Sequence, residues 1–121
     1  MTLQQYLDAY AGRTFEWGRD DCALFAARWV ENKTGKNPLV GQPKWYNLTD
    51  AARVIKSFGG MEKASLHVLG TPAKTCKEGD VALLQFPHNC MGIVGHGCVH
   101  VLTMAGMNTV SLGMAKYVWS V

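Results

Sequence analysis

The chain has one cysteine in a setting that favours nucleophilic chemistry. Cys22 directly follows Asp20 and Asp21 and stands at the start of a segment with helical periodicity. A thiol there lies near unpaired backbone N–H groups and the positive end of the helix dipole, which can lower a cysteine pKa from about 8.5 to roughly 3.5 to 7.5. Cys22 is therefore a candidate nucleophile. The alternative is a small core residue at the head of an apolar stripe.

A cysteine nucleophile needs an imidazole that takes its proton and a third group that orients the imidazole. The chain has four histidines. His67 falls on an expected helix and His96 at an expected hairpin tip, so both should face solvent. The candidate partners of Cys22 are therefore His100 first and His88 second.

Strand alternation brings the candidate residues together if the segment 95–97 is a three-residue hairpin loop. Gly92 then lies opposite His100 and leaves room for its ring, and His88 joins the same face if its strand reaches back that far. The alternative for His100 is a half-buried strand residue that only makes hydrogen bonds. The residues expected on one face are Cys90, Gly92, Cys98 and His100.

Two His and two Cys residues on these strands also suggest a metal site. His88 and Cys90 are separated by one residue, as are Cys98 and His100. Structural zinc ligands are usually about two to four residues apart on a tight turn, and the shorter spacing on a flat strand makes side chains diverge. We therefore expect no metal and no cofactor.

The elements that must position these residues change type halfway along the chain. Apolar residues recur with helical spacing in the first half and in short runs between turns in the second half. The pattern predicts an α+β domain in which N-terminal helices, including the one that carries Cys22, pack on a small antiparallel sheet. Helices are expected at 3–10, 22–34, 50–58 and 61–69, and strands of a meander at 81–86, 90–94, 98–103, 109–112 and 117–121, with a turn at Gly106/Asn108.

Composition narrows the class of protein. A chain of 121 residues predicts a single domain, 1–121, and 48% hydrophobic with 17% charged residues is typical of a globular protein. The net charge of +3 includes no basic run, so we expect no nucleic-acid partner. No signal peptide and no membrane span are visible, so we expect synthesis in a cytoplasm that keeps the four cysteines reduced.

Several motifs in order resemble those of a known family. They are Asp21-Cys22 before Phe25, the Gly59-Gly60 break, Gly79-Asp80-Val81 before a strand, Gly92-Ile93 within a strand, and a C-terminus with Trp119. This order and spacing resemble the NlpC/P60 branch of the papain-like cysteine peptidases. The chain looks closest to short phage and prophage proteins of that type found with tail genes.

The resemblance implies a role for each matching residue. In that family the cysteine attacks an amide of a peptidoglycan stem peptide, a histidine in a His-Val-Gly-Ile strand is the base, and a polar residue on the next strand orients it. Cys22 matches the nucleophile and His100 the orienting position, whereas the base position falls on Cys90. A thiol does not replace an imidazole near neutral pH.

Two functions follow from the resemblance. The first is a degenerate or specialised tail-tip or baseplate component, made in the bacterial cytoplasm and carried in the virion tail with other tail proteins as partners. The second is an active cysteine amidase or endopeptidase that cleaves peptidoglycan stem peptides as the phage enters the cell, with His100 or His88 as the base for Cys22. We favour the first because the expected base is missing. We interpret the tryptophans mainly as packing residues, and the alternative for Trp17 and Trp45, in loops near Cys22, is that they line a cleft.

Overall fold

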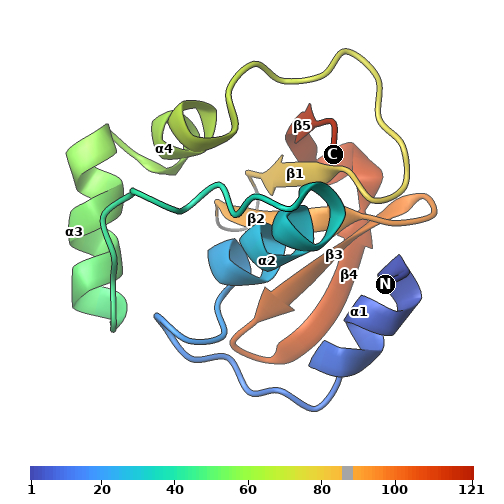
Figure 1. Ribbon diagram of the computed structural model, residues 1–121, viewed down its shortest axis with the longest axis horizontal. Helices are drawn as coiled ribbons and strands as arrows, with labels where there is room; N and C mark the ends of the chain where they lie inside the picture. Colours follow the sequence, from blue (N-terminus) through green and yellow to red (C-terminus); the bar gives the residue numbers. More distant parts are fainter. Residues whose placement is uncertain (86–88) are drawn as a thin grey trace.

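The computed structural model describes residues 1–85 and 89–121 and confirms an α+β architecture (Figure 1). Four helices precede five strands along the chain. In the described part of the chain, every helix is too short or too polar to serve as a membrane span. The helices are α1 (Leu3–Tyr10), α2 (Cys22–Thr34), α3 (Leu48–Phe58) and α4 (Met61–Leu69), and the strands are β1 (Val81–Leu84), β2 (Cys90–Val94), β3 (Cys98–Thr103), β4 (Gly106–Ser111) and β5 (Ala115–Trp119).

Local signals define the first two helices. At the start of α1, Thr2 and Gln5 form a reciprocal capping box. At the start of α2, the Asp21 side chain accepts a hydrogen bond from the backbone N–H of Leu24, and Gly35 ends the helix in the left-handed conformation. These two helices therefore begin where the sequence predicts.

The sheet is antiparallel, but it is not a simple meander. Its strand order is β4-β3-β2-β1-β5, so the last strand returns to the far edge and pairs with β1. Trp119 of β5 pairs with Val81 and is buried in the core. The expected turn at Gly106/Asn108 is wrong, because Gly106 already pairs with Thr103 and Asn108 lies within β4.

The hairpin between β2 and β3 is shorter than predicted. Ile93 pairs with His100, and the backbone N–H of Gly95 donates to the carbonyl of Cys98. Only two residues form the loop, and the second, Gly97, has a φ of +70°, which a glycine adopts without strain. A register shift of one residue moves side chains to the other face of a strand. Cys98 and His100 therefore share the face of Ile93, opposite Cys90 and Gly92, and the expected common face is wrong.

Apolar residues pack on both faces of the sheet. On one face, α2 packs against β2 and β3 (Figure 1). Aromatic side chains of α1 and α2 join the strands in the larger cluster. The smaller cluster lies on the other face and contains strand residues. The largest fully buried side chains include Trp29 and Phe25 of α2. The helix that begins with Cys22 is thus fixed to the sheet by its own core residues.

The Gly79-Asp80 turn has a structural role. Asp80 is 1% exposed, and its carboxylate accepts hydrogen bonds from the ammonium group of Lys77 at 2.5 Å and from the backbone N–H of Val121 at 3.1 Å. The indole N–H of Trp29 donates to the carbonyl of Gly79 at 2.7 Å. The turn therefore ties α2 to the last residue of the chain, and this accounts for a buried aspartate ahead of β1.

Candidate functional site

Cys22 is the first residue of α2, as the sequence predicts, and its side chain lies between this helix and β2. The residue is 8% exposed. Hydrogen bonds from the backbone of Met91, on β2, and of Ala23 favour the thiolate form and lower the pKa of Cys22. The local geometry of a helix-start thiol is therefore present.

Burial nevertheless outweighs these hydrogen bonds. The pKa of Cys22 is raised to about 12, mainly by desolvation, and the nearby charges of Cys90 and Asp21 contribute in the same direction. This is opposite to the lowered pKa expected from the helix start alone. The reason is that α2 packs its first residue against the sheet, where an unpaired negative charge is costly.

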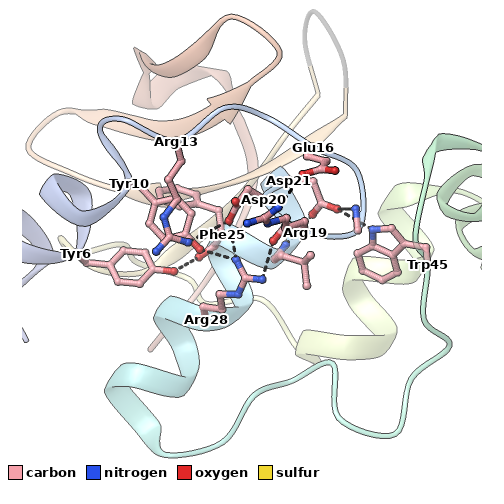
Figure 2. Close-up of polar contacts among 12 residues, drawn as sticks. Tyr6, Tyr10, Arg13, Glu16, Arg19, Asp20, Asp21, Phe25, Arg28 and Trp45 are labelled. Carbon is pink, nitrogen blue, oxygen red and sulfur yellow. Dashed lines mark hydrogen bonds and ion pairs between the residues drawn. The ribbon is translucent and has the colours of Figure 1, made fainter.

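The carboxylate of Asp21 organises the backbone around Cys22. It is 1% exposed and accepts three hydrogen bonds: from the backbone N–H of Leu24 at 2.9 Å, from that of Gly18 at 2.9 Å, and from the indole N–H of Trp45 at 2.7 Å. Figure 2 shows the Trp45 ring reaching this carboxylate from the loop between α2 and α3. One buried carboxylate thus caps α2 and holds the loops on either side.

Asp20 anchors the same segment on its other side. Its carboxylate lies 3.0 Å from Arg13 and 3.1 Å from Arg28. Arg28 also donates to the hydroxyl of Tyr10 at 2.8 Å and to the carbonyl of Arg19 at 2.6 Å (Figure 2). The cluster joins α1, α2 and the loop between them. The sequence did not single out Arg28, because its eight-residue spacing from Asp20 spans a loop and a helix.

His100 pairs with Ile93 and shares its sheet face, which packs with residues of α2. Its ring lies against Gly95, where an added Cβ would be 2.4 Å from Nε2, and Nε2 is 3.8 Å from the sulfur of Cys98. Burial lowers the pKa of His100, while the charge of Glu78 raises it. Among the described side chains, no hydrogen bond joins His100 to Cys22. The glycine that makes room for the ring is therefore Gly95, and the expectation for Gly92 is wrong.

Cys90 is a titratable neighbour of Cys22, whereas His88 lies outside the described residues. Burial raises the pKa of the Cys90 thiol. The Cys90 side chain is on the sheet face opposite Cys98 and His100, so these three do not converge on one point. The described residues contain no group of three or more His, Cys, Asp or Glu side chains suited to a metal ion.

A cavity of about 110 Å³ lies beside Cys22. It is bordered by α2, α3, α4, the loop between α2 and α3, and residues of the inner strands β1 and β2. Both tryptophans singled out in the sequence line it, and most other lining residues are apolar. The sequence predicts these helices but not the space between them, which depends on how they pack. Residues that define the cavity include Trp17, Cys22, Trp45, Val54, Met61 and Met91.

Comparison with known proteins assigns the chain to a family. The family model described as "Domain of unknown function (DUF6950)" matches residues 1–121, so the chain belongs to this family. No curated protein matches the sequence.

Proposed function

We propose that this member of the DUF6950 family is a non-catalytic tail-tip or baseplate component of a phage, built on an NlpC/P60-like fold. The burial of Cys22, which is 8% exposed, carries the proposal, because it raises the pKa of this candidate nucleophile to about 12. The motifs that resemble phage tail proteins supply the biological setting. In this account the cysteine helix is kept as a folding element.

The raised pKa has a direct chemical consequence. With a pKa of about 12, nearly all Cys22 side chains remain protonated thiols at pH 7. The thiolate is the form that attacks an amide, and an adjacent imidazole normally increases its share. Cys90, which stands where the resembling family has its base, is itself a thiol whose pKa burial raises, and its side chain belongs to the cluster on the sheet face opposite α2. Neither cysteine is therefore suited to amide hydrolysis near neutral pH.

The second candidate is a cysteine amidase or endopeptidase that cleaves peptidoglycan stem peptides. The cavity that reaches Cys22 favours it, because a substrate group could lie there beside the sulfur. The backbone N–H groups at the start of α2 would then stabilise an oxyanion. This function requires a base from His88 or His100, and the latter would have to leave its place against Gly95.

The test uses phage that carry Cys22→Ala, with Cys76→Ala as the matched control because Cys76 is an exposed cysteine. The proposal predicts complete tails and normal infectivity for both variants. It also predicts that the purified protein releases no new amine ends from peptidoglycan between acid and mildly alkaline pH. Complete Cys22→Ala particles that fail to enter cells, or amine release that this substitution abolishes, would establish the peptidase instead.

A further inference from the structure

The two edges of the sheet differ in how they are covered. At one edge, the backbone N–H of Ala73 donates to the carbonyl of Val118 in β5 at 2.7 Å, and Lys116 of the same strand forms an ion pair with Glu62 of α4. A bound loop and an edge lysine both hinder the pairing of another strand. At the other edge, β4 packs mainly against β3, and it contains neither a charged residue nor a proline. In the described part of the chain, β4 is therefore the unprotected edge.

Backbone hydrogen-bonding groups of β4 point away from the sheet. In an antiparallel strand, successive residues bond alternately to the neighbour on one side and to the neighbour on the other. The backbone N–H of Leu112 donates to the carbonyl of Gly97, so the even-numbered residues of β4 bond to β3. The odd-numbered residues Met107, Thr109 and Ser111 therefore direct their N–H groups outward, and the first two direct their carbonyls outward as well. These groups have no backbone partner in another described element.

The middle of β4 is open to solvent. Asn108 and Thr109 are both exposed, and so is Ser111. Since successive side chains of a strand point to opposite faces, the exposure of Asn108 and Thr109 means that both faces of the strand are open here. An approaching strand can therefore reach the outward N–H and C=O groups of β4 without displacing a described element. Such an open edge is a template for the pairing of another strand.

The sequence of this edge favours a second copy of the same chain as the partner. No aspartate, glutamate, lysine or arginine occurs between Asp80 and Lys116. Like charges opposite each other destabilise paired strands, and two copies of β4 meet without any. A charged strand of another protein would find no opposite charge in β4. An antiparallel pair of β4 strands about a twofold axis also places Thr109 opposite its own counterpart, and two threonines form a favourable cross-strand pair.

We propose that two copies of the chain pair through β4 about a twofold axis at Thr109, so that their two sheets become one continuous sheet. The Thr109 N–H of each copy donates to the Thr109 carbonyl of the other, and the Ser111 N–H of each donates to the Met107 carbonyl of the other. The pairing goes beyond the proposed function, because it uses neither Cys22 nor the cavity beside it. A single short strand buries little surface, so we expect a dissociation constant of about 0.1 to 1 mM.

Sedimentation velocity over a concentration series tests the pairing. The mass should rise from the 13.3 kDa of one chain toward twice that value between about 10 μM and 2 mM. Thr109→Lys places two ammonium groups opposite each other and should weaken the association about fivefold or more. Thr109→Pro removes the outward N–H but no hydrogen bond to β3, so it should abolish the association. Thr75→Lys adds a lysine at an exposed position outside the sheet and should change nothing.

A mixture of two variants tests the position of the axis. Thr109→Lys and Thr109→Glu should each associate weakly alone, because each places like charges opposite each other. In an equal mixture, the lysine of one copy faces the glutamate of the other, so the association should return at least to that of the unchanged chain. Circular dichroism first shows that each variant is folded. A strand pair with its axis elsewhere would not bring the two charges together.

Several results would overturn the pairing. A mass that stays at 13.3 kDa up to about 2 mM would show that the edge does not pair with itself and would leave it to a strand of another protein. Association that folded Thr109→Lys leaves unchanged, or that Thr75→Lys weakens equally, would place the contact on another surface. Association that the mixture fails to restore would exclude the axis at Thr109. None of these results affects the Cys22→Ala phage experiment, so the pairing and the proposed function can fail separately.

Discussion

The two sides of α2 are built differently. Toward α1, the helix packs aromatic rings closely: Tyr6, Tyr10, Phe25 and Trp29 have centroid distances of 5.0 to 5.7 Å. Toward α3 and α4, the same helix borders a cavity of about 110 Å³. Native interiors are normally packed without such spaces. The contrast indicates that α2 is packed more tightly on the α1 side than on the α3 side.

The difference also explains why Cys22 can keep its position without being reactive. Asp20 and Asp21 fix the backbone just before it through bonds to the loop after α1, to the loop after α2 and to α2 itself. The sulfur lies against β2, where burial disfavours its charge. A helix-start position therefore defines where the thiol is, and the packing around it decides its pKa.

The largest expected loss of stability follows from a substitution on the side of α2 that packs against α1. Trp29→Ala removes a ring that is 1% exposed and the indole donor to Gly79, so the free energy of unfolding should fall by about 3 to 5 kcal/mol. Val54→Ala on the cavity side should cost at most about 1 kcal/mol, since Val54 borders space already. Urea unfolding measures both. Equal losses for the two variants would contradict the contrast between the two sides.

The second largest loss of stability is expected when the carboxylate of Asp21, which connects the two sides of α2, is removed. Asp21→Ala removes the cap of α2 and leaves the N–H groups of Gly18 and Trp45 without their acceptor, so stability should fall by about 2 to 4 kcal/mol. Trp45→Phe removes one of the three hydrogen bonds and should cost about 1 kcal/mol. Thermal unfolding compares them. A Trp45→Phe loss as large as that of Asp21→Ala would show that the loop contact, not the cap, dominates.

The smallest effect comes from adding volume on the cavity side. Ala64→Leu places an isobutyl group in the cavity and should change stability by no more than about +1 kcal/mol, in the stabilising direction. Ala82→Leu adds the same volume at a residue that is 0% exposed within the sheet and should destabilise by about 1 to 3 kcal/mol. Stability changes of opposite sign for the two substitutions, measured by denaturant titration, would support the contrast between the two sides of α2. A similar loss for both substitutions would mean that the cavity has no usable space.

The part of the fold that the sequence predicts correctly depends on local chemistry. Three local signals each act within one turn of a helix. They are the capping box of Thr2 and Gln5, the N-cap at Asp21 and the C-cap at Gly35. The pairing of β2 with β3 depends on whether the loop has two or three residues, and one glycine can serve either. The placement of β5 beside β1 depends on contacts across the whole sheet. Such contacts are not encoded in a short segment.

The candidate site shows the same division between local features, which the sequence predicts, and contacts between distant segments, which it does not. The sequence correctly places Cys22 at the head of a helix and Trp17 and Trp45 beside it. It could not show that burial raises the pKa of Cys22, because that depends on packing against β2. It also placed His100 on the same face as Cys90 and Gly92, through a register error of one residue. The spacing of residues along the sequence is therefore a poor predictor of a site that two distant segments form together.

The central claim, that burial keeps Cys22 protonated and unreactive, is tested by the pH dependence of its alkylation. Iodoacetamide labelling followed by mass spectrometry compares Cys22 with the exposed Cys76 in the same molecule, and urea-unfolded protein provides the reference. With a pKa of about 12, Cys22 should react at least about 100-fold more slowly than Cys76 at pH 8, and its rate should rise toward pH 12. Faster alkylation of Cys22 than of Cys76 near neutral pH would contradict the account and favour the peptidase.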